Sequence, residues 1–410
     1  MVRKEGLDGT ISPLFEAANK KSGVDVRRLC GYIAIAVLCS AFLSCADVGR
    51  DPNSGALTTP TASNGPSTIH ASAFPTLQAA INALPASGGT LFIDGQFEAT
   101  ATGACLGAVS SKIASDPGPC ILKRSHIRIL GDGVTSKIYT TSPSTTALQV
   151  LGSDAIAISG VEFVGPWSAG KPTGSAVAVR IDAVFAQDKT TASTRVTVEN
   201  CRVHNFAFDG LWARNGTAQI HFQHNESYGN AGNAIEIEAQ DSSVVDNDLH
   251  DNRGQGLEIY SAAQRVSVAN NRMTRDAVGI QLVNDPDYGT LSAISVVGNN
   301  ADNNAQAGIE YTSTGPGVTP SGVITIKGNT AVRNRHDGIS LDYAGVGITV
   351  SDNVAASNAD ADISVRQSSD VIVSNNILTR LPGGPKAANG ILISPDSARV
   401  HVLNNATDGF

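Results

Sequence analysis

The chain repeats one arrangement of apolar and polar positions along most of its length. Two apolar residues stand two positions apart and an Asn follows three residues later, as in Ile220-x-Phe222-x-x-Asn225. The arrangement returns every 22 to 30 residues, and Cys201 stands in for Asn in the first copy. Alternating apolar residues predict a short strand with one buried face, and this interval predicts a solenoid. The later Asn positions are Asn247, Asn271, Asn299, Asn329, Asn353, Asn376 and Asn405.

A second strand is predicted about ten residues after each of these positions. One repeat cannot bury its apolar face alone, whereas repeats stacked in register bury a continuous column. Strands of one type then lie ~4.8 Å apart, and we expect the Asn side chains to stack at the turns as hydrogen-bonding, structural groups. The second strands read Gly210-Leu211, Ala234-Ile235-x-Ile237, Gly256-Leu257-x-Ile259, Gly279-Ile280-x-Leu282, Gly308-Ile309, Gly338-Ile339-x-Leu341, Asp362-Ile363-x-Val365 and Gly390-Ile391-x-Ile393.

The N-terminal part of the chain lacks the repeat. A basic pair and a short apolar run predict an export signal over residues 1–45, and the run is too short for a membrane span. Cys45 fits a bacterial lipoprotein cleavage site, which predicts a lipid anchor in the cell envelope; a plain signal peptide and a secreted protein is the alternative. The composition of residues 46–72 predicts a solvated tether. Residues 73–410 are predicted to form the repeat domain, which begins with a helix over residues 76–84.

Composition narrows the classes of protein that the chain can belong to. Its 410 residues are 5% aromatic and 16% charged, with 41 Gly and a net charge of −8. These values favour many short strands over a helical enzyme or a disordered polymer, and they give no reason to expect a nucleic-acid partner. In an exported protein, we expect Cys105 and Cys120 to form a disulfide and Cys201 to be a buried thiol. The spacing of the cysteines does not resemble that of a zinc site.

The residues 76–97 and the run 127–133, Ile-Arg-Ile-Leu-Gly-Asp-Gly, resemble the N-terminal cap and an early coil of the pectate-lyase-like superfamily. With the repeats, the resemblance extends over residues 73–405. It implies an all-β fold, a right-handed parallel β-helix with a short N-terminal capping helix. The superfamily contains lyases, hydrolases, epimerases, adhesins and inert assembly proteins, so the resemblance implies the fold and leaves the function open. The oligomeric state is also left open.

Two outward-facing columns on the second strands carry the candidate chemistry. The residue between the two apolar positions points outward, and the next outward residue lies two positions later. We expect the polar side chains to be most concentrated over the three successive coils that contain Trp212, Glu236 and Glu258. The first column contains Trp212, Glu236, Glu258, Gln281 and Glu310, and the second contains Arg214, Glu238 and Tyr260.

The pair Glu236 and Glu258 is the centre of this group. One strand spacing separates the two carboxyls, so either a pKa is raised or a cation such as Ca²⁺ lies between them, with both residues as ligands. A hydrolase would use the two as its carboxyl pair. A lyase would use Tyr260 or His250 to take the proton, and Arg214 or a cation to neutralise a uronate. The other members of the two columns are predicted to bind the substrate.

Asp209 precedes the coil of Trp212 in the run Phe208-Asp209-Gly210-Leu211. Phe208 and Asp209 resemble part of the Tyr-Gly-Phe-Asp-Pro-His motif of mannuronan C5-epimerases, and Asp209 is therefore a further catalytic candidate. Gly210 and Leu211 replace the Pro and His of that motif. The sequence predicts a lyase or hydrolase that acts on a polysaccharide. The alternative is a non-catalytic β-helix that binds carbohydrate or another surface.

Overall fold

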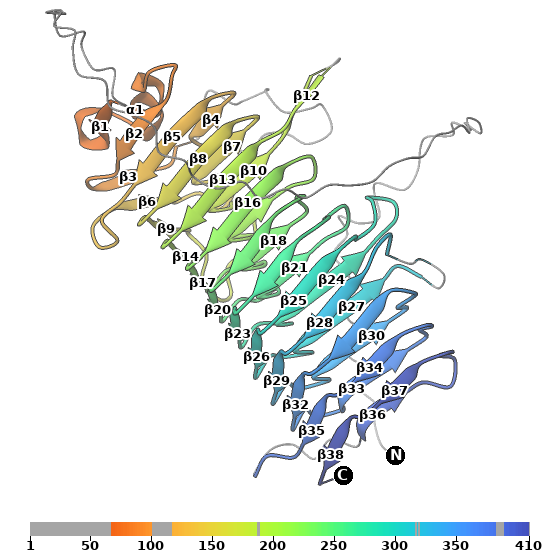
Figure 1. The fold of residues 1–410 in the computed structure, drawn as a ribbon. Helices are drawn as coiled ribbons and strands as arrows, with labels where there is room; N and C mark the ends of the chain where they lie inside the picture. Colours follow the sequence, from red (N-terminus) through yellow and green to blue (C-terminus); the bar gives the residue numbers. More distant parts are fainter. Residues whose placement is uncertain are drawn as a thin grey trace, which may run out of the picture. The chain divides into compact units, whose positions relative to one another are not determined.

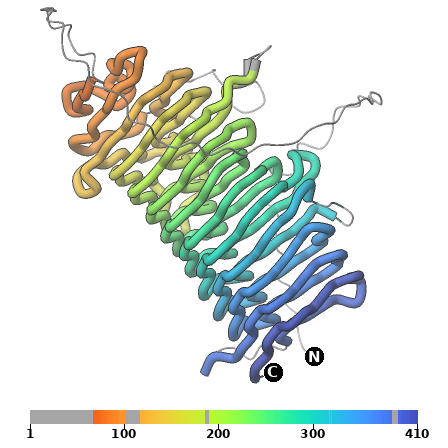
Figure 2. Tube along the Cα trace, in the orientation of Figure 1, coloured from red at the N-terminus to blue at the C-terminus, as the bar shows by residue number. Residues whose placement is uncertain are grey.

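The computed structural model describes residues 67–100, 117–186, 189–315, 318, 320–382 and 389–409. Almost all strands of these residues run parallel and belong to three long sheets (Figure 1). Each coil contributes one strand to each sheet, and the coils stack from the capped N-terminal end to residue 409 (Figure 2). This is a right-handed parallel β-helix, as predicted.

We call the three sheets A, B and C. Sheet A contains β1 (Thr68–His70), β2 (Gly89–Phe92), β5 (Ser125–Leu130), β8 (Asp154–Ser159), β13 (Thr194–Glu199), β16 (Ala218–Gln223), β19 (Ser243–Val245), β22 (Ser267–Ala269), β25 (Ile294–Val297), β28 (Ile324–Lys327), β31 (Ile348–Ser351), β34 (Ile372–Ser374) and β37 (His401–Leu403). Sheet B contains β3 (Gln96–Glu98), β6 (Lys137–Tyr139), β9 (Glu162–Val164), β14 (Arg202–His204), β17 (Glu226–Tyr228), β20 (Asp248–His250), β23 (Arg272–Thr274), β26 (Asn300–Asp302), β29 (Thr330–Val332), β32 (Val354–Ala356), β35 (Ile377–Thr379) and β38 (Ala406–Asp408). Sheet C contains β4 (Cys120–Leu122), β7 (Leu148–Leu151), β10 (Val179–Asp182), β15 (Leu211–Ala213), β18 (Ile235–Ile237), β21 (Leu257–Ile259), β24 (Ile280–Asn284), β27 (Ile309–Ser313), β30 (Ile339–Asp342), β33 (Ala361–Arg366) and β36 (Asn389–Ile393).

The inward residues of the sheets form one continuous core. Val198, Phe222 and Val244 occupy one register position on successive strands of sheet A, and all three are fully buried. Leu211 and Ile235 do the same in sheet C. The two predicted strand types are therefore confirmed as sheets A and C. The short strands of sheet B, which follow each Asn, were not predicted.

The repeated Asn residues form the expected ladder at the turn between sheets A and B. Asn225 Nδ2 donates to Asn247 Oδ1 at 3.0 Å, and Asn247 Nδ2 donates to Asn271 Oδ1 at 2.9 Å. The ladder begins at Cys201, whose backbone N–H donates to Asn225 Oδ1. The Cys201 thiol is free and buried, as predicted, and burial raises its pKa to about 12. A second ladder, at the turn between sheets B and C, was not predicted; it contains Asn230, Asn252, Asp276, Asn304, Asn334 and Asn358.

A helix closes the N-terminal end of the core. Helix α1 (Leu77–Ala83) follows the short 3₁₀ helix η1 (Ala71–Ala73), and the Thr76 side chain accepts a hydrogen bond from the Ala79 N–H as its N-cap. Leu77 and Ile81 are buried against the first coil, so the predicted helix is confirmed. The predicted tether is too long, however, because Thr68–His70 already pair with β2. The described residues contain no helix with the length and hydropathy needed to cross a membrane.

One segment that interrupts the sequence repeat contains part of the solenoid. Residues 165–194 break the predicted repeat, yet they include β10 of sheet C and the antiparallel hairpin β11 (Val184–Ala186) and β12 (Lys189–Thr191). β10 pairs with β7 and β15, so sheet C continues through this segment without a gap. Arg180 and Asp182, whose side chains point away from the core, thereby extend by one coil the columns that contain Trp212 and Arg214.

Candidate active site

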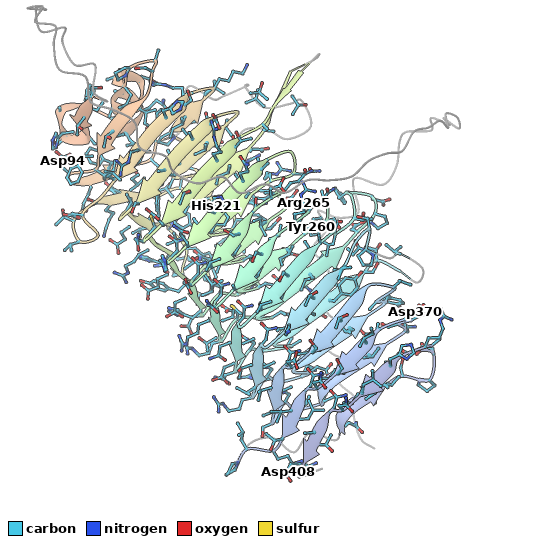
Figure 3. The ribbon with its side chains drawn as sticks, viewed as in Figure 1. Asp94, His221, Tyr260, Arg265, Asp370 and Asp408 are labelled. Atoms are coloured by element: carbon cyan, nitrogen blue, oxygen red, sulfur yellow. The ribbon has the colours of Figure 1, made fainter. Side chains whose placement is uncertain are left out.

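The outward column of sheet C has the predicted order. Trp212 is the register partner of Glu236, Glu236 of Glu258, and Glu258 of Gln281. Gln281 is in turn the partner of Glu310. Tyr260 follows β21 and lies about midway along the solenoid, between Asp94 near one end and Asp408 at the other (Figure 3).

Four carboxyl groups of three successive coils adjoin one another on this face. We call Asp209, Glu236, Glu238 and Glu258 the acidic cluster. Asn233 connects three of its members: its Nδ2 donates to Glu258 Oε2 at 2.7 Å and to Glu236 Oε2 at 3.3 Å, and its backbone N–H donates to Asp209 Oδ1 at 2.6 Å. The charges of Asp209, Glu258 and Glu238 all act on Glu236. Because a carboxylate can only accept hydrogen bonds, close approach of two carboxyls is favourable only when one of them is protonated.

Burial among like charges favours the protonated forms of the cluster. Burial raises the pKa of Asp209 and of Glu258 to about 7 in each case. Burial, followed by the charges of Asp209 and Glu258, raises the pKa of Glu236 well above its ordinary value. Burial also raises the pKa of Glu238. The site therefore holds protonated carboxyls near neutral pH, beside carboxyls that can ionise.

The turn at Asp209 is close to the next coil because that coil carries glycine. A Cβ at Gly232 would lie 2.3 Å from Asp209 Oδ1, which leaves no room for a side chain there. Asp209 is almost fully buried and accepts the Asn233 N–H through this close approach. Asp209, which its sequence run indicated as a catalytic candidate, therefore lies inside the acidic cluster, although no His is adjacent to it in the sequence.

Two arginines and a tryptophan adjoin the acidic cluster on its N-terminal side. The Cζ atoms of Arg214 and Arg180 lie 4.7 Å and 5.3 Å from the centre of the Trp212 ring. Both arginines interact with Asp182, at 3.4 Å and 2.9 Å. Trp212 Nε1 donates to Glu238 Oε1 at 3.2 Å. Arg180 and Asp182 were missed in the sequence, although the alternation of Val177, Val179 and Ile181 indicates their strand.

Tyr260 borders the cluster on its C-terminal side. Its hydroxyl donates to Asp285 Oδ2 at 3.3 Å, and its ring meets the ring of Tyr288 edge to face at 5.9 Å. Burial, and then the charge of Asp285, raises the Tyr260 pKa. A phenol that keeps its proton more firmly than usual is a poor general base near neutral pH.

His250 does not join this group. It lies in β20 of sheet B, whereas Glu258 lies in β21 of sheet C. Its ring stacks on Tyr228 with centres 5.0 Å apart, its Nδ1 lies 2.7 Å from Asp251 Oδ2, and its Nε2 lies 3.4 Å from Glu226 Oε1. His250, the alternative base of the lyase hypothesis, therefore lies on a different sheet from Glu258, because three residues of each coil form the unpredicted strand of sheet B.

The inserted loops extend from both edges of sheet C near the cluster. Residues 165–178 connect β9 with β10 at one edge, where the Trp167 N–H donates to the Asn205 carbonyl at 2.7 Å. Trp167, Lys171, Pro172 and Arg253 line an open hollow of about 680 Å³ along this loop. Residues 285–293 connect β24 with β25 at the other edge and carry the exposed Tyr288.

Two further predictions concern covalent and metal sites. Among the described residues, no group of three or more His, Cys, Asp or Glu is arranged to hold a metal ion. A calcium ion between Glu236 and Glu258 stays a prediction. Cys120 is disulfide-bonded, whereas its expected partner Cys105 and the lipidation candidate Cys45 lie outside the described residues.

Comparison with known proteins identifies the repeat region. The model of the family described as right handed beta helix region matches residues 183–321 and 315–409, together more than half of the chain. No curated protein matches the sequence. The A-module of the mannuronan C-5 epimerase AlgE4 from Azotobacter vinelandii superposes with a TM-score of 0.62 and 14% identity, over 84% of this chain and 98% of its own.

Two other solved structures are similar to this chain. The catalytic unit of a thermostable α-1,3-glucanase from Streptomyces thermodiastaticus has a TM-score of 0.53 and 13% identity, over 86% of this chain and 70% of its own. A Dettilon tailspike protein has the same TM-score and 12% identity, over 77% of this chain and 61% of its own. At such identities the likeness shows the fold alone.

Proposed function

This chain belongs to the right-handed β-helix family, and on that premise we propose that it hydrolyses glycosidic bonds of a polysaccharide at the acidic cluster. The observation that carries the proposal is the pair Glu236 and Glu258, register partners on adjacent strands whose carboxyls share the Asn233 amide. The named activities of the similar epimerase and α-1,3-glucanase support a carbohydrate substrate.

The two carboxyls have different environments, which supports different roles. Glu236 is almost fully buried among other carboxyls and has the more strongly raised pKa, so it keeps a proton to donate to the leaving sugar oxygen. Glu258 is more exposed and accepts a 2.7 Å hydrogen bond from Asn233, which favours its ionised form as the nucleophile. One strand spacing, ~4.8 Å, is close to the carboxyl separation of retaining glycosidases.

The remaining groups have supporting roles in this proposal. Trp212 holds the guanidinium groups of Arg180 and Arg214 at one end of the cluster. The charges of Asp209 and Glu238 add to the effect of burial and keep the pKa of Glu236 high. Lyase chemistry has less support, because Tyr260 donates its hydroxyl to Asp285 and holds its proton.

The first experiment is a substrate panel with the purified protein. Neutral glycans and polyuronates are incubated with Ca²⁺ and, separately, with chelator. We expect new reducing ends without ultraviolet-absorbing unsaturated ends, and no loss of activity with chelator, because the proposed chemistry needs no metal. Unsaturated ends would establish a lyase instead. A glycan that is bound without any cleavage would favour the non-catalytic alternative.

The stereochemistry of the product tests the carboxyl spacing. Proton NMR of the first product formed from the responsive glycan distinguishes retention from inversion at the anomeric carbon. We expect retention, since Glu236 and Glu258 are too close to admit a water molecule for direct displacement. Inversion would assign the nucleophile to water and require two carboxyls that lie further apart, such as Asp209 and Glu258, whose coils are separated by two strand spacings.

We also propose that the protein is exported, on the basis of the N-terminal signal pattern in residues 1–45. Lipidation of Cys45 would hold it in the cell envelope. Mass spectrometry of the mature N-terminus, with a Cys45→Ala variant as the control, distinguishes the anchored protein from a secreted one. A diacylglycerol-modified N-terminal Cys supports the anchor, and an unmodified mature N-terminus excludes it.

A further inference from the structure

A second hollow lies further along the outer face of sheet C. It has a volume of about 270 Å³, and its lining comes largely from strands β27, β30 and β33 and the turns before them. Glu258 is two strand spacings from the register position of Glu310 and three from that of Ser340. The hollow therefore begins about 10–15 Å from Glu258, on the same face.

Arg366 organises the floor of this hollow. Its Nη1 donates to Asp337 Oδ2 at 2.7 Å, to Ser364 Oγ at 2.9 Å and to Ser340 Oγ at 3.1 Å. Ser340 Oγ in turn donates to Asp342 Oδ2 at 3.1 Å. Asp337 is almost fully buried, so its pairing with Arg366 fixes the guanidinium in place. The floor thus presents a rigid set of polar groups.

Carboxyls outnumber cations in the hollow. Glu310, Asp337, Asp342 and Asp360 contribute four carboxyl groups, against the guanidinium of Arg366 and the imidazole of His336, whose Nδ1 lies 2.8 Å from Asp360 Oδ2. Asp342 lies 3.9 Å from Arg366, and Glu310 accepts a hydrogen bond from Gln281 rather than from a cation. Burial raises the pKa of Glu310 and of Asp342. A further carboxylate brought to this place would meet repulsion, whereas hydroxyl groups would find acceptors in the carboxyls and a donor in Arg366.

We infer that this hollow is a second glycan-binding subsite, which holds an uncharged sugar residue of the chain that the acidic cluster cleaves and rejects uronic acid residues. The inference rests on the proposed function and adds the substrate class to it. Because the hollow is more than one sugar residue away from Glu258, the subsite makes binding depend on the length of the glycan. Because the hollow and the acidic cluster lie on the same face of sheet C, one extended glycan can contact both of them.

The test uses the full-length Glu258→Gln protein, so that bound glycans are not cleaved. The probe is an array of neutral and uronic oligosaccharides printed in graded lengths. We expect binding to a neutral series that strengthens once the oligosaccharide is long enough to reach the hollow, and no such gain for the uronic series. Equal or stronger binding of long uronic oligosaccharides would overturn the inference.

Variants of the hollow supply the matched comparison. Asp342→Ala is added to the Glu258→Gln protein; it removes a hydrogen-bond acceptor with little disturbance of the fold, since the Asp342 side chain is partly exposed. Glu310→Gln is the second variant. We expect each to bind long neutral glycans about tenfold more weakly and short ones equally, as the loss of a hydrogen bond to a charged group implies. Asp352→Ala, at an exposed ion pair of sheet A, is the control and leaves binding unchanged.

Kinetics separate the subsite from the catalytic proposal. In the active protein, Asp342→Ala raises the KM for long substrates and leaves kcat nearly unchanged, because the hollow does not touch the cleaved bond. If Glu258→Gln abolishes cleavage while neither hollow variant alters length dependence, the subsite is refuted and the hydrolase stands. If the length-dependent binding is found but the native protein cleaves nothing, the hydrolase is refuted and the glycan-binding hollow stands.

Discussion

Asp276 occupies a place in the second ladder that neighbouring coils fill with Asn. Its Oδ1 accepts from both the backbone N–H and Nδ2 of Asn252, each at 2.9 Å. Its Oδ2 is buried, and the described part of the structure offers that oxygen no hydrogen-bond partner. Burial raises the Asp276 pKa to about 7. Folding therefore favours the protonated form, whose stabilising contribution is complete below the unfolded pKa and is lost as the pH rises through about 7.

Asp276→Asn is expected to stabilise the protein at alkaline pH. The new amide would donate to Asn304 Oδ1, as Asn304 Nδ2 donates to Asn334 Oδ1 at 3.0 Å. We expect the free energy of unfolding to rise by about 2–4 kcal/mol at about pH 9 and by much less at about pH 4. Urea denaturation at both pH values measures this, with the exposed Asp352→Asn as control. An equal change at both pH values would contradict the assigned titration.

At the scale of strands, sheet C brings like charges together. β18 and β21 hold Glu236 and Glu258 as register partners, and Glu238 directly follows β18. The folded pKa values of these carboxyls lie above their ordinary values, as does that of Asp209. The cluster therefore destabilises the fold progressively as the pH rises through about 7, which is a common property of catalytic sites.

Glu236→Gln should thus separate activity from stability. Removing the proton donor is expected to lower kcat by about 10²–10⁴-fold. The same change removes a carboxyl that must take up a proton when the protein folds at alkaline pH, so the midpoint of urea denaturation should rise at alkaline pH relative to the native protein. The measurement pairs the activity assay with denaturation at about pH 9. A variant that loses both activity and stability would indicate a structural role for Glu236.

The N-terminal cap depends on a second interaction between elements. At the C-terminal end of helix α1, Arg124 donates from Nη1 to the Ile81 carbonyl at 2.7 Å and from Nη2 to the Leu84 carbonyl at 2.6 Å. Arg124→Met is expected to lower the free energy of unfolding by about 1–3 kcal/mol. Urea denaturation with Arg128→Met, at an exposed position of β5, is the comparison. Equal stability of both variants would refute this role.

At the scale of the whole solenoid, the periodicity of the coils determines which features could be predicted from the sequence. Stacked coils depend on periodicity alone, so the pattern around Asn225 predicted the strand register that joins Trp212, Glu236 and Glu258. Loops of irregular length break that periodicity, which is why Arg180 was missed. His250 was misplaced because the strands of sheet B are too short to produce an apolar alternation.

The protonation states of the carboxyls in the site could not be predicted from the sequence. A column of outward residues gives their order, whereas burial and the hydrogen bonds of Asn233 decide which carboxyl keeps its proton. The hollow around Arg366 likewise depends on side-chain packing between coils. The sequence therefore predicted the position of the cluster, and the structure supplies the roles proposed for its members.

The most direct test of the central claim is reducing-end release from the responsive glycan by three proteins measured in parallel. These are the native protein, Glu258→Gln, and Glu199→Gln, which makes the same change on the outer face of sheet A, where Glu199 accepts a hydrogen bond from Gln223. Hydrolysis at the acidic cluster predicts that Glu258→Gln loses about 10²–10⁴-fold in kcat while Glu199→Gln keeps native activity and both keep the native fold. Native activity in Glu258→Gln would contradict the account.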